Sequence, residues 1–88
     1  MRRLTKRDIE NIIGTTVKGY AIEAARIKSG PFIDSDHYGF LLGRNAHGEY
    51  VTWHFHLLED ESIYVYWGHY FMEDRDAALR DFETRGAN

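Results

Sequence analysis

Apolar and polar residues alternate along three stretches in the second half of the chain, and this period of two predicts β-strands. The stretches are residues 38–44, 50–57 and 62–70. A four-residue segment, Asn45–Gly48, separates the first two, and an acidic turn at Glu59–Glu61 separates the second from the third. This spacing predicts an antiparallel meander of three strands.

The alternation assigns the strand residues to two faces of the predicted sheet. Pairing Arg44 with Glu49 across the first turn sets the register, because the two side chains carry opposite charges. On this register one face forms the core, with Phe40, Leu42, Val51, Trp53, Phe55, Leu57, Ile63, Val65 and Trp67. The other face carries no charged side chain and consists of Gly39, Leu41, Gly43, Tyr50, Thr52, His54, His56, Tyr64, Tyr66 and Tyr70.

Helix signals lie at both ends of the chain. Thr5 is placed as an N-cap with Asp8 completing a capping box, and a first helix would end at Gly14. Residues 74–85 have acids in the first turn and arginines late, which favours a second helix. Within it, pairs such as Asp81 with Arg85 are expected to contribute about 0.2–0.5 kcal/mol each. The expected buried stripes are Ile9, Ile12 and Ile13 in the first helix and Ala78, Leu79 and Phe82 in the second.

Residues 15–28 give mixed signals. Three β-branched residues at the start favour a strand, whereas the alanines after Gly19 favour a helix. The helix is the preferred interpretation, and the alternative is a strand over residues 16–27, which would add a fourth strand to the sheet. Ser29–Pro31 would end either element, and residues 32–37 are expected to form a loop.

The composition fits one small domain that spans residues 1–88, with 43% hydrophobic and 28% charged residues. A core of this size is close to the lower limit for independent stability, so a dimer would add useful burial. The absence of cysteine excludes disulfides and thiolate metal sites and fits a reducing cytoplasm. No apolar run reaches the roughly 20 residues that span a bilayer, and polar residues follow Met1–Arg3. We therefore expect a cytoplasmic protein without a membrane partner.

Charge is distributed unevenly along the chain. Residues 1–30 contain seven basic and three acidic side chains, a net charge of +4, whereas residues 31–88 contain four basic and eleven acidic ones, a net charge of −7. Fields of one sign can orient two copies or steer a basic partner. Ordinary solvated faces are the preferred interpretation, since no run of like charges is long.

The uncharged tyrosine and histidine face is the main functional candidate. A sheet face that meets only water normally carries charge, so this face predicts a contact surface. The alternative is that one of the helices covers it. Because tyrosine and tryptophan are enriched at interface hot spots, protein contact or self-association is the favoured function, and a homodimer is one form of it. The candidate binding residues are Tyr50, His54, His56, Tyr64, Tyr66 and Tyr70.

Metal binding and catalysis have less support. His54 and His56 project to one side of a strand, as two imidazole ligands would. A third ligand is missing, because His69 would point to the core unless Gly68 introduces a bulge that reverses it. We therefore expect no metal and no cofactor. No serine lies near a histidine with an acidic orienter, so no catalytic residue is assigned and no enzymatic activity is expected.

Single-stranded nucleic acid is the alternative partner, because aromatic residues on a sheet can stack bases. Phosphate binding requires lysines and arginines beside the aromatic residues, and only Arg44 lies near the predicted sheet. The basic N-terminal segment could supply cations if it packs beside the sheet. Nucleic acid is therefore kept as an alternative that the charges do not favour.

Three segments within residues 38–85 are FLLGRNAHGEYVTWHFH, YVYWGHYF and DRDAALRDFETR. In these segments the chain resembles small proteins that conjugative transposons of Gram-positive gut bacteria encode. It implies an accessory role in a mobile genetic element, without an assigned activity or site residue. The sequence as a whole predicts an α+β domain with a three-stranded or four-stranded antiparallel sheet, a short N-terminal helix and a C-terminal helix, acting as a non-catalytic binding domain.

Overall fold

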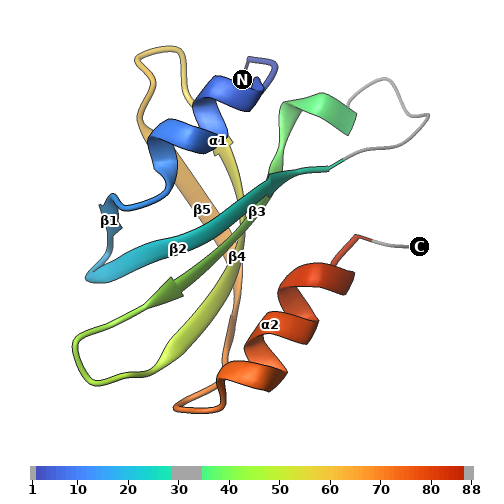
Figure 1. The fold of residues 1–88 in the computed structure, drawn as a ribbon. Coiled ribbons are helices and arrows are strands. Elements are labelled where there is room, and N and C mark those ends of the chain that lie inside the picture. The colour runs from blue at the N-terminus through green and yellow to red at the C-terminus, as the bar shows by residue number, and fades with distance from the viewer. Residues whose placement is uncertain (1, 29–34, 87–88) are drawn as a thin grey trace.

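The computed structural model describes residues 2–28 and 35–86, and within them the chain forms an α+β fold (Figure 1). The helices in this part of the chain are α1 (Lys6–Ile12) and α2 (Arg75–Thr84), with a 3-10 turn η1 (Ser35–His37). The strands are β1 (Thr16–Val17), β2 (Tyr20–Ile27), β3 (Gly39–Arg44), β4 (Tyr50–Leu57) and β5 (Ile63–Tyr70). Each strand pairs antiparallel with its neighbour in the chain, in the order β1-β2-β3-β4-β5.

The fold class, the antiparallel sheet and both terminal helices are confirmed, whereas the predicted number of strands is too low. Residues 16–27 form β1 and β2, which contradicts the helix interpretation. The turn between them has φ of 50° at Lys18 and 86° at Gly19, the left-handed backbone that tight hairpins use. Helix propensity from the alanines is overridden because β2 pairs with β3 from Ala21 to Ile27, and β1 adds pairing at Tyr20 and Ala21. The expected turn at Ser29–Pro31 and loop residues 32–34 lie outside the described residues.

Each face of the sheet packs against one helix. On the face of α1, Ile12 is buried and Ile9 packs against the core, whereas Ile13 is exposed because α1 ends at Ile12. The capping box is confirmed, since Thr5 Oγ1 accepts from the backbone N–H of Asp8 at 3.2 Å and an Asp8 carboxylate oxygen accepts from the N–H of Thr5 at 2.7 Å. The buried residues of the α1 core are Leu4, Ile12, Ile22, Leu41, Val51, Trp53, Phe55 and Leu57, and those of the α2 core are Phe40, Leu42, Tyr50, Ala78 and Phe82.

Strand β3 is shifted by one residue from the predicted register. Arg44 pairs with Tyr50 instead of Glu49. Glu49 belongs to the turn, where the Asn45 side chain accepts from the backbone N–H groups of His47 at 3.0 Å and Glu49 at 2.9 Å. A slip of one residue exchanges the faces of a strand. Leu41 therefore lies in the α1 core, and Phe40 and Leu42 lie in the α2 core, the reverse of the predicted arrangement.

Strand β5 contains a bulge. Two consecutive residues, Trp67 and Gly68, lie opposite the single residue Trp53, because the register shifts between Thr52 and His54. A Cβ atom on Gly68 would lie 2.9 Å from the indole nitrogen of Trp53, so a side chain there would displace the buried ring. Trp67 has φ of 53° and its side chain is 70% exposed. The prediction that Trp67 belongs to the core is therefore wrong.

Arg85 fastens the end of α2 to this bulge. Its buried guanidinium donates to the carbonyl oxygen of Thr52 in β4 at 3.0 Å and to that of Trp67 in β5 at 2.6 Å. One turn earlier, a single carboxylate oxygen of Asp81 accepts from the Thr52 hydroxyl and lies 2.9 Å from Nδ1 of His69. Burying charged groups is unfavourable unless they are hydrogen-bonded, and these contacts satisfy that condition.

Two cations, Arg26 in β2 and Lys28 directly after it, bind the carbonyl groups at the end of α2. Arg26 donates from Nε to the carbonyl of Phe82 at 3.0 Å and from Nη2 to that of Arg85 at 2.5 Å, and the Lys28 ammonium donates to the carbonyl of Gly86. The last carbonyls of a helix lack partners within the helix and carry partial negative charge. The position of α2 along the sheet is thus set by β2 as well as by the bulge.

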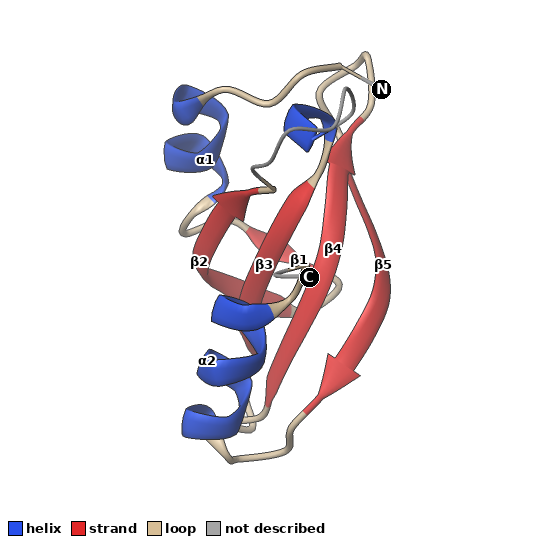
Figure 2. Ribbon diagram, turned by 90° about the vertical axis from the view of Figure 1, so that its right-hand side faces the viewer, coloured by secondary structure: helices blue, strands red, loops and turns tan. Residues whose placement is uncertain are grey.

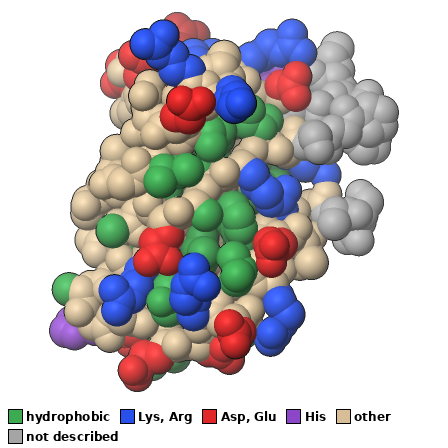
Figure 3. Space-filling view, in the orientation of Figure 1, with side chains coloured by type: hydrophobic (Ala, Val, Ile, Leu, Met, Phe, Trp, Pro, Cys, Tyr) green, Lys and Arg blue, Asp and Glu red, His purple; other side chains and the backbone are tan. Residues whose placement is uncertain are grey.

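Charged side chains of both signs are interspersed on the face seen in Figure 3. They lie around the apolar side chains that fill the middle of that view. This mixing fits the interpretation of ordinary solvated faces for much of the uneven charge.

Candidate contact surface

Helix α2 divides the predicted tyrosine and histidine face into two halves. Tyr50 and Thr52 are buried, and Tyr50 packs in the α2 core. Figure 2 shows that α2 covers one half of the strands, while β4 and β5 continue past its end. The interpretation that a helix covers the face is therefore right for one half, and Tyr50 is not available there for binding.

The uncovered half carries a continuous network of aromatic rings. His54 lies at its centre, with its ring stacked on Tyr38 at a centroid distance of 5.8 Å and meeting Trp67 edge-on at 5.0 Å. His56 stacks on Tyr64 at 4.9 Å, and Tyr66 contacts both histidine rings. Ring pairs of this kind contribute about 0.5–1.5 kcal/mol each. We call these six residues the aromatic patch: Tyr38, His54, His56, Tyr64, Tyr66 and Trp67.

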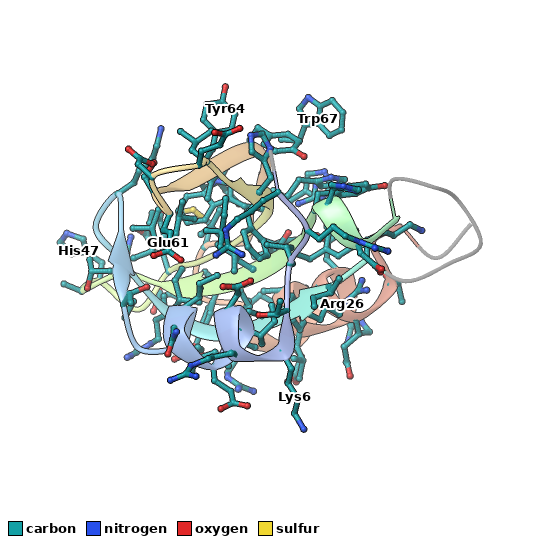
Figure 4. The ribbon with its side chains drawn as sticks, turned by 90° about the horizontal axis from the view of Figure 1, so that it is seen from above. Lys6, Arg26, His47, Glu61, Tyr64 and Trp67 are labelled. Carbon is teal, nitrogen blue, oxygen red and sulfur yellow. The ribbon has the colours of Figure 1, made fainter. Side chains whose placement is uncertain are left out.

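The pairing of β4 with β5 builds this network. His54 lies opposite Tyr66 and His56 lies opposite Tyr64, so the rings meet across the strands. Tyr64 and Trp67 form the outer part of the patch, with 51% and 70% of their surface exposed. Figure 4 shows both side chains projecting away from the body of the protein. The other four rings are half-buried and support them.

Besides Tyr50, three positions differ between the predicted binding residues and the aromatic patch, and the bulge explains two of these three. An inserted residue reverses the alternation that follows it, so Trp67 joins the patch and Tyr70 leaves it. Tyr70 pairs with Val51, a residue of the α1 core, and therefore lies on the opposite face. Tyr38 was missed because the mistaken register of β3 puts it on the same side as Phe40 and Leu42, away from the tyrosine and histidine face. Gly68 is the sequence signal that could have indicated the bulge and hence both changes.

Both patch histidines are neutral at pH 7. Their Nδ1 atoms are buried and have no hydrogen-bond partner within the described part of the chain. Burial lowers the pKa of His54 to about 4, with smaller contributions in the same direction from the positive charge of Arg85 and from His69. Burial also lowers the pKa of His56. The patch therefore presents no full charge to a partner at neutral pH.

Acidification is expected to destabilise the fold through His54. Because its folded pKa of about 4 lies below the unfolded value near 6.5, the unfolded state binds more protons between these values, and stability is lost as pH falls. We expect a loss of about 1 kcal/mol between about pH 7 and 5, after allowance for the contact of the ring with water. Urea unfolding at both pH values measures it. His54→Phe keeps a ring without titrating, so an unchanged pH dependence in that variant would contradict the assignment.

The bulge at Gly68 moves the side chain of His69 to the other face of the sheet. This was the condition under which His69 could act as a third metal ligand. His69 lies on the α2 side, but its Nδ1 faces Asp81 at 2.9 Å and its Nε2 lies 3.3 Å from a guanidinium nitrogen of Arg85. Both ring nitrogens are thus occupied by neighbours. Residues 2–28 and 35–86 contain no group of three histidine, aspartate, glutamate or cysteine side chains placed to hold a metal ion.

The cations near the patch are engaged within the protein. Arg26 and Arg85, which both act on the pKa of His54, bind backbone carbonyl groups at the end of α2 and around the bulge. The N-terminal arginines Arg2 and Arg3 form ion pairs with acidic side chains. Phosphate binding needs cations beside the stacking rings, so this arrangement gives little support to the nucleic-acid alternative.

No helix among the described residues has the length and apolar character needed to cross a membrane.

No protein-family model matches the chain, and no curated protein and no solved structure is significantly similar to it. The resemblance to transposon-encoded proteins therefore stays a prediction, and the geometry of the aromatic patch is the basis for assigning a function.

Proposed function

We propose that the protein is a non-catalytic binding domain that contacts a partner protein through the aromatic patch. The observation that carries the proposal is the continuous network of six rings on the half of the sheet face that α2 leaves uncovered. Contiguous exposed apolar surface marks contact sites, and tyrosine and tryptophan supply much of the energy of protein interfaces.

Two properties of the patch favour a protein partner. Its rings are held by neighbours on β4 and β5, so they lose little conformational freedom when a partner binds. Its histidines are uncharged at pH 7, so a partner can cover them without removing a charge from water. The resemblance to transposon-encoded proteins would place such a partner among the proteins of a mobile genetic element.

An unbiased selection from a library of displayed random peptides tests the proposal. We expect the wild-type protein to enrich peptides that the double variant Tyr64→Ala with Trp67→Ala binds at least about tenfold more weakly, because the two most exposed rings are lost. The matched control is Ile13→Ala with Met72→Ala, which removes two exposed apolar side chains outside the patch. Its binding should stay within about twofold of wild type.

Enriched peptides that bind the Tyr64 and Trp67 double variant as tightly as the wild type would contradict the proposal, as would a failure to enrich any peptide. Sedimentation of the wild type over a range of concentrations tests whether the partner is a second copy. A dimer that the double variant fails to form would support the self-association form. Salt-sensitive binding of single-stranded oligonucleotides that the double variant loses would favour nucleic acid instead.

A further inference from the structure

Strand β5 is an edge of the sheet. It pairs with β4 on one side, and no described strand lies on its other side (Figure 2). The opposite edge strand, β1, has 2 residues, whereas β5 has 8. An edge strand presents backbone N–H and C=O groups that another extended chain can pair with. The free edge of β5 therefore lies directly beside the aromatic patch.

The hydrogen bonds at both ends of β4 show which residues of β5 point outward. Leu58 donates its N–H to the carbonyl of Ser62 at 2.9 Å, and Tyr50 exchanges backbone bonds with Phe71 and Met72. Backbone groups alternate in direction along a strand, so every second residue of β5 from Ser62 to Tyr66 faces β4. Ile63 and Val65 lie between them and direct their N–H and C=O groups to the free edge.

This edge lacks the features that usually prevent an edge strand from pairing with another chain. Natural edge strands carry lysine, other charged residues or proline, and the segment from Ile63 to Tyr66 has none of these. The bulge at Trp67 and Gly68 interrupts the regular backbone beyond that point. The segment open to pairing is thus Ile63–Tyr66, whose Tyr64 and Tyr66 side chains belong to the patch.

The charges around β5 favour a basic partner over a second copy. Acidic residues lie before the strand at Glu59, Asp60 and Glu61 and after it at Glu73 and Asp74. Two copies paired antiparallel along β5 would bring these acidic ends together, and facing like charges are unfavourable. An extended segment with basic residues at its ends would instead be attracted to both.

A pocket of about 220 Å³ lies beside Ile63 on the α1 side of the sheet. Its ionisable lining is Arg2, Asp8 and Glu61, one positive and two negative side chains, and Asn11 adds a polar group. The Arg2 guanidinium donates to both carboxylates and holds the pKa of Asp8 below its usual range. A net charge of −1 suits a lysine or arginine side chain.

We propose that the Ile63–Tyr66 edge binds an extended, basic peptide segment of the partner protein as an added β-strand. In a strand, successive side chains point to opposite faces. One set of peptide side chains would rest on the aromatic patch, and the other set would place a lysine or arginine in the pocket lined by Glu61 and Asp8. Backbone hydrogen bonds supply affinity in this binding mode and side-chain pockets supply specificity. The inference rests on the proposed function, since it names the partner of the same surface.

The probe is an acetylated and amidated peptide of alternating valine and threonine with a lysine at each end. Tryptophan fluorescence and calorimetry measure its binding to the full chain. We expect a Kd of about 100 µM or tighter for this peptide and binding at least about tenfold weaker when glutamate replaces both lysines.

Backbone methylation of the peptide tests the added strand directly. Two versions of the peptide carry N-methyl groups on every second residue. One is methylated at the odd-numbered positions and the other at the even-numbered positions. Only the N–H groups that face β5 form hydrogen bonds, so one version should bind at least about tenfold more weakly and the other should bind like the parent. Equal binding by both versions would overturn the inference.

Variants of the chain give a second readout. Val65→Pro removes an N–H group that faces the free edge and leaves the bonds to β4 in place, so it should lose peptide binding, whereas Val65→Thr should keep it. Glu61→Gln should weaken binding, and Glu83→Gln on the exposed face of α2 should not. If Val65→Pro fails to fold, the methylated peptides still show whether the peptide binds as an added strand.

The outcomes separate this inference from the proposed function. Peptides that tolerate methylation at either set of positions but lose binding to the Tyr64→Ala and Trp67→Ala double variant would overturn the added strand and leave the patch as the contact surface. Binding weaker than about 1 mM by the lysine-ended peptide would also overturn the inference, while the library selection still judges the patch.

Discussion

Trp53→Ala is expected to lower the free energy of unfolding by about 3–5 kcal/mol. Its side chain is 3% exposed, meets the ring of Tyr20 edge-on at 5.3 Å and lies beneath the backbone of Gly68. Truncation would leave a cavity at the centre of the α1 core. Because small domains are stable by only about 5–15 kcal/mol, much of the population would unfold.

Trp67→Ala is expected to cost less than about 1 kcal/mol, since the side chain is largely exposed and its ring pairs are with His54 and Tyr66 at the surface. Urea unfolding followed by circular dichroism measures both variants. The sequence alone predicts that the two tryptophans are buried on the same face. Equal destabilisation by Trp53→Ala and Trp67→Ala would support that prediction and contradict the bulge.

Arg85→Met is expected to lower the free energy of unfolding by about 3 kcal/mol. Methionine keeps the apolar stem but removes the donors to the carbonyl groups of Thr52 and Trp67. It also leaves the partly buried carboxylate of Asp81 without its nearest guanidinium, whose Nε lies 3.9 Å away. We expect α2 to separate from the sheet before the rest of the fold opens.

Arg80→Met is the matched control, because Arg80 lies on the exposed side of the same helix and should change stability by less than about 0.5 kcal/mol. Urea unfolding gives the two free energies, and amide hydrogen exchange shows whether protection is lost first in α2. Equal stability of the Arg85→Met and Arg80→Met variants would show that the guanidinium network does not hold α2.

Elements with local signals could be predicted from the sequence. The cap of α1 depends on Thr5 and Asp8, which lie close together in the chain, and the buried stripe of α2 follows the helical period with Ala78 and Phe82. The strands β3, β4 and β5 show alternation that does not depend on their partners. In β2 the alanines favour a helix locally, and pairing with β3 along Ala21–Ile27 makes the segment a strand.

The assignment of residues to the two sheet faces could not be predicted in full. In β3 and in β5 it depends on one residue that changes how the strand pairs with its neighbour. Asn45 takes Glu49 into the turn and shifts β3 by one position. Gly68 allows the chain to pass over Trp53 and reverses the faces after Tyr66. Asp81 and Arg85 look like a weak surface pair in the sequence, yet both reach partners on β4 and β5. Nothing in the helix itself indicates those distant partners.

The same reasons explain the outcome for the candidate site. His54, His56, Tyr64 and Tyr66 lie together as expected, because they precede the bulge and alternate on two adjacent strands. Tyr50 is covered because α2 is anchored over its half of the sheet, and that anchoring involves long-range contacts. The predicted pairing of β4 with β5 was thus enough to identify the residues at the centre of the patch. It was not enough to identify the residues at its borders.

The central claim is that a partner binds at the aromatic patch and the adjacent edge of β5. The most direct measurement is an amide chemical-shift map of the isotope-labelled protein with a saturating amount of a selected peptide. We expect the largest changes at His54, His56 and residues 63–67, with small changes along the outer face of α2. Changes concentrated on α2 or α1, with β5 unaffected, would contradict the account.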